Sequence, residues 1–217
     1  RYTMALEFAS KKETFPRYKV FETELAGRPF VVETGKMCGL SNGSCLVRYG
    51  ETAVLCNVTM SDKPRDGIDF FPLSVDFEEK LYSVGRIPGS FMRREGRPGA
   101  EAVDRPIRPL FPKDMRNDVS VVMTVMSVDQ DCSPEIAGMI GTSIALSISD
   151  IPWKGPIAGV FMGLVDGELV VNPTEKQREA SDLQLTVAAS AEKIVMIEAG
   201  ANEVDEATML KAIKTGD

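Results

Sequence analysis

The chain has 217 residues and a formal net charge of −7, and 43% of its residues are hydrophobic, which is typical of a soluble globular protein with a sizeable core. It contains no histidine. A Ser-His-Asp or Cys-His nucleophile system, a histidine general base and a histidine-ligated zinc are therefore excluded. The four cysteines show neither a CxxC pair nor metal-like spacing, so we expect buried, reduced thiols.

No apolar run approaches the length that crosses a membrane. The first twelve residues, RYTMALEFASKK, lack the apolar core and the cleavage site of a signal peptide. We therefore expect a cytoplasmic protein that makes no contact with a membrane.

Residues 18–60 are predicted to form a four-stranded meander, with strands at 18–25, 28–34, 44–50 and 52–60. Both alternating sets of residues in the last strand are fairly apolar, which indicates a central strand covered on two faces. Residues 73–78 alternate between apolar and polar side chains. This pattern predicts a strand with one solvent-exposed face, and it leads directly into a basic stretch.

Residues 119–128 form a nearly continuous apolar, β-branched run, which predicts a second central strand. A helix is expected to begin next, with Ser133 as its N-cap, Pro134 at its first position and Glu135 in its first turn. Small residues at 138, 141 and 145 should let this helix approach its neighbours closely. The predicted apolar stripe consists of Ile136, Met139, Ile140, Ile144 and Ile148.

A hairpin is expected at 157–171, with its turn at Asp166-Gly167. A short helix near 174–180, two strands at 182–190 and 193–199, and a helix at 203–214 complete the expected elements. Strands in meanders with a few helices indicate an α+β fold, in which mixed and antiparallel sheets pack with a few helices.

The basic stretch runs from Gly85 to Pro112, and residues 86–116 hold eight Lys and Arg side chains against four Asp and Glu. Phe91 and Met92 directly precede Arg93 and Arg94, in a segment that glycines and prolines keep irregular. An apolar face for a base beside guanidinium groups for phosphates suits single-stranded nucleic acid. The residues alone leave a second interpretation open, a solvated or interface loop that pairs with acidic surface.

Several long segments resemble a known family. They are ETGKMCGLSNGSCLVRYGETAVL (33–55), DFFPLSVDFEEKLYSVGRIPGSFMRREGRPG (69–99), DRPIRPLFP (104–112), SPEIAGMIGTSIALSISDIPWKGPI (133–157) and DGELVVNPT (166–174). Together they resemble the first of the two RNase PH-like domains of bacterial polynucleotide phosphorylases (polyribonucleotide nucleotidyltransferases). The resemblance extends from about residue 18 to 210.

This resemblance implies an N-terminal extension over 1–17, the first RNase PH-like domain over 18–200, and the start of a helical linker domain over 201–217. It implies a complete protein that is a 3′-to-5′ exoribonuclease, in which inorganic phosphate attacks the terminal phosphodiester of RNA and releases a nucleoside diphosphate. It also implies that the complete protein binds single-stranded RNA, forms a homotrimeric ring and interacts with the partners of an RNA-degradation complex. Mg²⁺ is the implied cofactor, with its site in the second RNase PH-like domain, outside this chain.

The chain itself is expected to lack a catalytic centre and a metal site. Two Asp residues of the active domains correspond here to Asn172 and Arg178, and neither is an anionic ligand. Asp129 and Asp131 are better explained as turn and capping residues, and Asp166 as a hairpin-turn residue. The alternative is a non-catalytic module that only binds RNA and assembles. A related small-molecule kinase would need a Gly-rich phosphate loop, which is not present.

In the family, the loop that matches 91–94 projects into the ring's central channel and contacts RNA. It usually carries two Phe, where this chain has Phe91 and Met92. Arg97, Arg105 and Arg108 are as consistent with structural Arg-Asp and Arg-carbonyl pairs as with RNA contact. The candidate RNA-binding residues are Phe91, Met92, Arg93, Arg94, Arg97, Arg105 and Arg108.

The sequence departs from the family between Ala100 and Asp104, where the family has several more residues, including another Arg. A true deletion is expected to strain the join. That expectation favours a sequence from which part of the natural chain is missing at this point.

Overall fold

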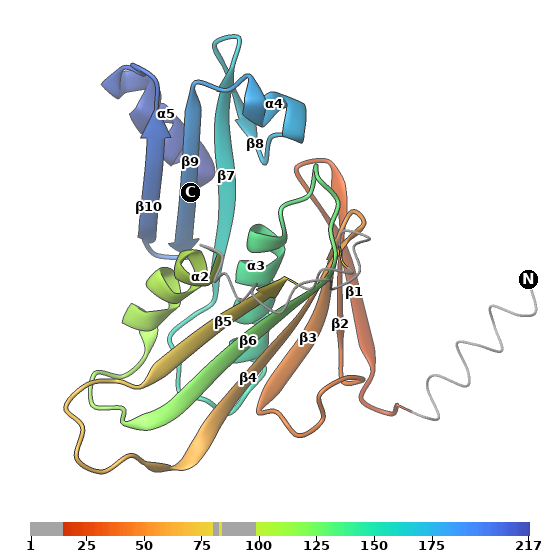
Figure 1. Ribbon diagram of the computed structural model, residues 1–217, viewed down its shortest axis with the longest axis vertical. Coiled ribbons are helices and arrows are strands. Elements are labelled where there is room, and N and C mark those ends of the chain that lie inside the picture. Colours follow the sequence, from red (N-terminus) through yellow and green to blue (C-terminus); the bar gives the residue numbers. More distant parts are fainter. Residues whose placement is uncertain (1–14, 80–82, 84–98) are drawn as a thin grey trace, which may run out of the picture.

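The computed structural model describes residues 15–79, 83 and 99–217, which form two β-sheets with helices packed on them (Figure 1). The first sheet has six strands in the order β1-β2-β3-β4-β6-β5, and the second has four in the order β10-β9-β7-β8. The strands are β1 (Lys19–Leu25), β2 (Arg28–Thr34), β3 (Gly43–Tyr49), β4 (Thr52–Pro64), β5 (Leu73–Glu79), β6 (Asn117–Ser127), β7 (Ile157–Val165), β8 (Glu168–Val171), β9 (Leu183–Ser190) and β10 (Ile194–Ala201). The helices are α2 (Gly99–Ile107), the 3₁₀ turn η2 (Arg108–Leu110), α3 (Pro134–Ser147), α4 (Glu175–Glu179) and α5 (Glu206–Gly216).

The predicted meander is confirmed, because β1 to β4 pair antiparallel in chain order. The β1–β2 turn places Ala26 and Gly27 at φ of 50° and 73°, the positive values that a tight hairpin turn requires. β4 and β6 are neighbours in the interior of the sheet, as expected, and β5 adds to β6 in parallel. From Thr52 to Val58 one face of β4 is buried, but the alternate residues are only half-buried, so the expected second cover is incomplete.

α3 begins as predicted, and it is buried more widely than a single stripe. The Ser133 hydroxyl accepts hydrogen bonds from the backbone N–H groups of Glu135 and Ile136. The face with the small residues lies deepest, since a Cβ built on Gly141 would lie only 2.5 Å from Cys56 Sγ. The predicted stripe was wrong at its end, where Ile148 is 50% exposed. α3 is buried on more than one side because it lies between β3 and β4 on one side and β7 and α2 on the other.

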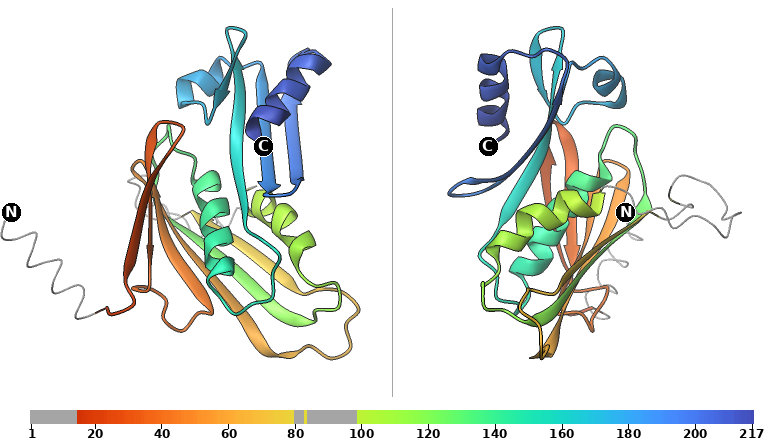
Figure 2. Two further views of the ribbon diagram at one scale, coloured as in Figure 1. Left: turned by 180° about the vertical axis from the view of Figure 1, so that it is seen from behind. Right: turned by 60° about the vertical axis from the view of Figure 1, so that its left-hand side comes forward.

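The second sheet has its own small core. The β7–β8 turn holds Asp166 and Gly167 at φ of 51° and 80°, which confirms the predicted hairpin. α5 packs against β7 and β9 (Figure 2), and its start is shifted from the expected residue because Asp205 is the N-cap and accepts from the Thr208 N–H. The buried residues of this core are Met162, Leu183, Leu185, Val187 and Ala212.

Two further expectations concern α2 and the cysteines. α2 runs without interruption through residues 100–104, and none of these residues has a positive φ. All four cysteines are free thiols; Cys45, Cys56 and Cys132 are buried as predicted, whereas Cys38 is exposed. Among the described residues no helix has the length and apolarity that a bilayer span requires.

Candidate nucleic-acid interface

The described part of the chain contains only the downstream edge of the basic stretch. The predicted RNA-binding residues Phe91, Met92, Arg93, Arg94 and Arg97 lie outside the described residues. The two elements that flank them are described: β5 ends at Glu79 and α2 begins at Gly99. The remaining two candidates, Arg105 and Arg108, lie on α2 and on the η2 turn that follows it.

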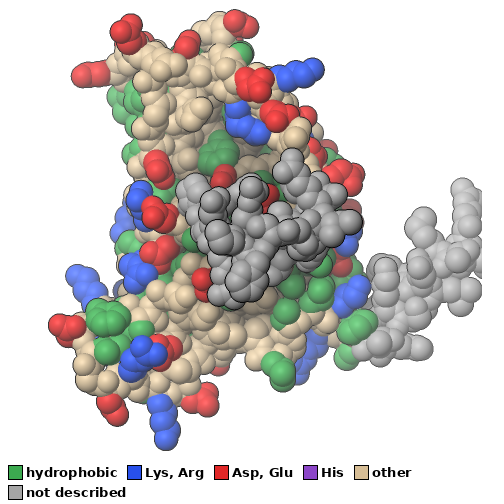
Figure 3. All heavy atoms as spheres, viewed as in Figure 1, with side chains coloured by type: hydrophobic (Ala, Val, Ile, Leu, Met, Phe, Trp, Pro, Cys, Tyr) green, Lys and Arg blue, Asp and Glu red, His purple; other side chains and the backbone are tan. Residues whose placement is uncertain are grey.

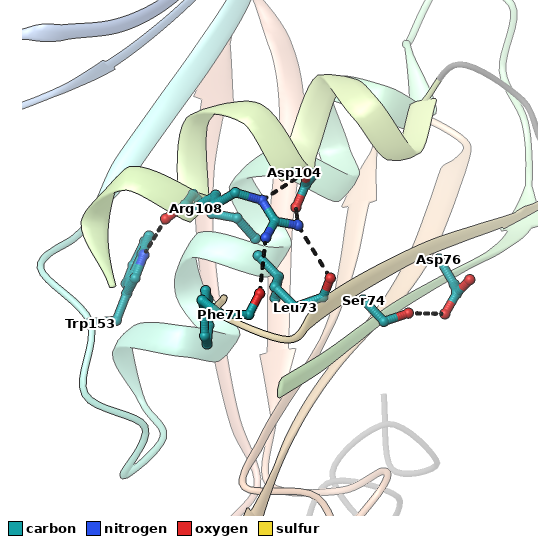
Figure 4. A network of polar contacts seen from close by, with 8 residues as sticks. Phe71, Leu73, Ser74, Asp76, Asp104, Arg108 and Trp153 are labelled. Atoms are coloured by element: carbon teal, nitrogen blue, oxygen red, sulfur yellow. Dashed lines mark hydrogen bonds and ion pairs between the residues drawn. The ribbon is translucent and has the colours of Figure 1, made fainter. Parts of the chain in front are cut away.

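Arg108 joins α2 to the start of β5 (Figure 4). Its Nε lies 3.1 Å from Asp104 Oδ2 and its Nη2 lies 2.8 Å from Asp104 Oδ1, so the two side chains form a bidentate pair. The same guanidinium donates to the carbonyls of Phe71 at 3.4 Å and Leu73 at 3.2 Å. This geometry is the structural role that the sequence left open for Arg108, and a charge already matched by Asp104 contributes little to attracting RNA.

Arg105 is also matched by acidic groups. Its guanidinium lies 3.0 Å from Glu101 on the same helix and 3.9 Å from Glu198 on β10, and its side chain is 55% exposed. In the view of Figure 3, the described Lys and Arg side chains are interspersed with Asp and Glu, with no continuous basic band. The described basic side chains of this region therefore form no phosphate-binding surface of their own in this view.

An aromatic cluster holds the far end of α2. The Phe71 and Phe111 rings lie with their centroids 4.8 Å apart, and Phe111 lies 6.5 Å from Trp153. The Trp153 indole N–H donates to the Ile107 carbonyl at 3.2 Å, which satisfies a carbonyl at the helix C-terminus (Figure 4). Together with Arg108, this cluster fixes α2 along β5. The segment that carries Phe91 to Arg97 thus begins and ends on two elements that are firmly packed on each other.

Asn172 and Arg178, which the resemblance aligns with two Asp of the active domains, supply no anionic ligand. Asn172 is buried, and its Oδ1 accepts the Phe161 N–H at 2.9 Å. Arg178 donates to the carbonyls of Pro173 and Gln130. No group of three or more His, Cys, Asp or Glu able to hold a metal ion occurs among the described residues. The local residues do not fit Mg²⁺, because an amide and a guanidinium occupy the places where anionic oxygens are needed.

Asp129 and Asp131 shape the loop before α3. Asp129 accepts the N–H of Asp131 at 3.0 Å, and Asp131 accepts the N–H of Glu175 at 2.9 Å, in the first turn of α4. Burial raises the pKa of Asp129, but the backbone N–H groups of Asp131 and Glu51 outweigh this effect and hold the pKa below its usual value. These contacts are the turn and capping contacts that the sequence indicates.

Arg28 is a residue that the sequence reasoning missed. It donates to the Asp131 carbonyl at 2.6 Å and to the Asn172 carbonyl at 2.9 Å, and it lies over the Tyr49 ring at 5.8 Å. Arg178 bonds the same loop from the other side, through Gln130. The two arginines thereby connect the first sheet to the second. The one sequence signal for this role is that Arg28 is a basic residue at the start of a half-buried strand.

A cavity of about 740 Å³ lies beside Arg178, between α4 and the free face of β7, β9 and β10. Its charged lining residues are one arginine and three glutamates, Glu175, Glu179 and Glu198. This excess of negative charge repels phosphate groups. The lining of this cavity therefore does not suit a phosphate-binding site.

Comparison with known proteins identifies the family. Models of the 3′ exoribonuclease family match residues 26–152 (domain 1) and 155–216 (domain 2), which separate the first sheet from the second. Polyribonucleotide nucleotidyltransferase of Ruminiclostridium cellulolyticum is 61% identical over 205 residues, and that of Clostridioides difficile is 60% identical over 202. These alignments cover 92% and 90% of this chain and 29% of each relative.

The fold agrees with a solved structure, described as the Archaeoglobus fulgidus exosome with RNA bound to the active site. One of its chains is 18% identical, with a TM-score of 0.67 and coverage of 93% of this chain and 84% of that chain. The predicted RNase PH-like α+β fold is thus confirmed. This chain belongs to the RNase PH family of 3′ exoribonucleases.

Proposed function

We propose that this chain is the RNA-gripping, ring-forming first RNase PH-like domain of a phosphorolytic 3′-to-5′ exoribonuclease. The observation that carries the proposal is the 61% identity to a polyribonucleotide nucleotidyltransferase across 92% of this chain. Because the chain spans only 29% of that relative, the activity belongs to the longer protein. In that protein RNA and inorganic phosphate yield a shortened RNA and a nucleoside diphosphate.

The local geometry supports a non-catalytic role for the chain itself. Phosphorolysis brings two phosphate groups together, so it needs positive groups or a carboxylate-bound metal at the reacting oxygens. Asn172 and Arg178 supply no carboxylate. Asn172 Oδ1 accepts the Phe161 N–H, and Arg178 donates to the carbonyls of Pro173 and Gln130. In the proposed assembly, Mg²⁺ is bound in the second RNase PH-like domain of a homotrimeric cytoplasmic ring that works with RNA-degradation partners.

The test is binding of a fluorescent single-stranded oligoribonucleotide in the presence of phosphate and Mg²⁺, with nucleoside diphosphate release followed in parallel. We compare the wild type with Arg93→Ala/Arg94→Ala and with the matched control Lys154→Ala/Lys193→Ala, whose two cations are exposed and lie far along the chain from the loop. We expect salt-dependent binding by the wild type and the control, weaker binding and a shallower salt slope for the loop variant, and no diphosphate from any of them.

Two results contradict the proposal. Diphosphate release by the pure chain would mean that it contains a catalytic centre after all. Equal binding by the loop variant and the control would mean that Arg93 and Arg94 do not grip RNA. The alternative function, an RNA-binding and assembly module without an enzymatic parent, is separated by joining the chain to the remainder of a relative and testing for phosphorolysis.

A further inference from the structure

A second cavity is lined by residues of β1, of the β2–β3 connection and of the end of α3, on the side of the first sheet that α3 covers. Its volume is about 610 Å³. Three cations line it, Arg17, Lys19 and Lys36, and no Asp or Glu does. In a chain with a net charge of −7, a cavity with an all-positive lining is a local reversal of charge.

No neighbour among the described residues neutralises the three cations. Within the described residues, none of them forms an ion pair with a carboxylate. Lys36 Nζ instead lies 5.6 Å from the centroid of the Tyr18 ring and 5.9 Å from that of Phe15. Cation–π contacts hold the ammonium in place while leaving its charge intact. The cavity therefore presents positive charge to solvent.

Glu33 and Asp150, whose chain neighbour Thr34 and hydrogen-bond partner Asn42 line the cavity, are engaged with other groups. Glu33 accepts the Tyr18 hydroxyl at 2.6 Å and pairs with Arg48 at 2.7 Å. Asp150 accepts from the Asn42 amide at 2.9 Å. Neither carboxylate lines the cavity, so neither repels an anion from inside it.

Apolar surface lies beside these charges. Phe21 is 58% exposed although it pairs with the buried Val32 on the face of the sheet that α3 covers. Lys19 lies two residues before it on the same face of β1. Met37 and Ile148, which are 37% and 50% exposed, also line the cavity. An exposed ring among unneutralised cations is the combination that binds single-stranded nucleic acid.

We propose that this cavity is a second contact for single-stranded RNA, with phosphates held by Arg17, Lys19 and Lys36 and a base stacked on Phe21. The inference rests on the proposed function, that the longer protein acts on RNA. The three cations come from two separate segments, the β1 side and the β2–β3 connection. This spread fits successive phosphates of a strand better than the single charge of a small anion.

The test separates charge from stacking with two variants in the full chain. We expect Arg17→Ala/Lys19→Ala to weaken oligoribonucleotide binding and to reduce the slope of log K against log salt by about 1.4, because each of the two lost phosphate contacts of a single strand contributes about 0.7. We expect Phe21→Ala to lower affinity about fivefold or more with the slope unchanged, because stacking involves no counterion release. Lys154→Ala/Lys193→Ala is the matched control and should bind like the wild type.

Crosslinking provides a readout that a folding defect does not mimic. An oligoribonucleotide with 4-thiouridine, irradiated on the wild type and on Arg93→Ala/Arg94→Ala, should label peptides that contain residues 17–21 or 36–44. Each variant's thermal melt and mass by light scattering are recorded alongside.

Three outcomes overturn the inference. The first is that neither of these peptides is labelled at saturating RNA. The second is that both cavity variants bind RNA like the wild type. If Arg93→Ala/Arg94→Ala weakens binding in the same experiment, the proposed function stands and only the RNA contact at the cavity is refuted. The third is a cavity variant that binds RNA normally but loses self-association, which would assign the surface to a protein partner.

Discussion

Arg108 and Asp104 lie one helical turn apart and meet through two hydrogen bonds of 3.1 and 2.8 Å, while the same guanidinium bonds the carbonyls of Phe71 and Leu73. One side chain thus ties α2 to the beginning of β5. These two elements flank the segment that carries the predicted RNA-binding loop. The described contacts of Arg108 are therefore structural: they join the two elements that precede and follow that segment.

We predict that Arg108→Ala lowers the free energy of unfolding by about 1–2 kcal/mol, since it leaves two carbonyls and a carboxylate without their charged donor. Arg105→Ala is the control, because its exposed pair with Glu101 is worth at most about 0.5 kcal/mol. Urea unfolding followed by circular dichroism measures both. Equal losses for the two variants would show that the bonds from Arg108 to β5 contribute nothing to stability.

The close contact between α3 and the first sheet depends on glycines in the helix. A Cβ at Gly141 would lie 2.5 Å from Cys56 Sγ and 2.8 Å from Val47 Cγ2, inside a fully buried interface. We therefore predict that Gly141→Ala destabilises the chain by about 1–3 kcal/mol. Gly138→Ala is the comparison, since its new Cβ meets the flexible Met123 side chain at 3.0 Å. Urea midpoints should fall further for Gly141→Ala, and the reverse order would refute this account of the packing.

The four thiols should differ in reactivity. Cys38 is exposed, whereas Cys45, Cys56 and Cys132 are buried. Burial, then the charge of Asp129 and a hydrogen bond to it, raise the pKa of Cys132 to about 11. We predict that iodoacetamide at pH 8 modifies Cys38 in the folded chain and the other three only after urea is added, as read by peptide mass spectrometry. Rapid labelling of Cys132 without urea would contradict the described packing.

The elements that local residues specify were predictable. The start of α3 follows from Ser133, Pro134 and Glu135, and the β7–β8 turn follows from Asp166-Gly167, because caps and tight turns are decided within a few residues. The depth of burial around Ile148 was not predictable in this way. It depends on which elements pack around the end of α3, and a helical pattern does not contain that information.

The site was predictable only in part. The pairing of Arg108 with Asp104 lies within one helical turn, but its carbonyl acceptors lie 35 and 37 residues away. The contacts of Arg28 span 103 and 144 residues, and no spacing rule reaches that far. The assignments of Phe91, Met92, Arg93, Arg94 and Arg97 stay predictions. The cations at 17, 19 and 36 acquire meaning only when the fold places them around one cavity.

Tyr18 and Glu33 offer a pH-dependent test of the structure beside that cavity. The hydrogen bond to Glu33, then burial, then the charge of Glu33 raise the pKa of Tyr18 to about 12, from 10.0. Between pH 10 and 12 the unfolded chain has lost a proton that the folded chain keeps, so this contribution to stability is complete below pH 10 and disappears as the pH rises through 12.

We predict that absorbance at 295 nm shows a tyrosine titrating near pH 12 in the folded wild type. This step should be absent from Tyr18→Phe and shifted toward 10 in Glu33→Gln, which removes the acceptor's charge. Unfolding free energies should fall more steeply from pH 10 to 12 in the wild type than in Tyr18→Phe. Equal slopes would mean that the 2.6 Å hydrogen bond from Tyr18 to Glu33 does not form in solution. In that case this bond would not hold the Glu33 carboxylate away from the cavity.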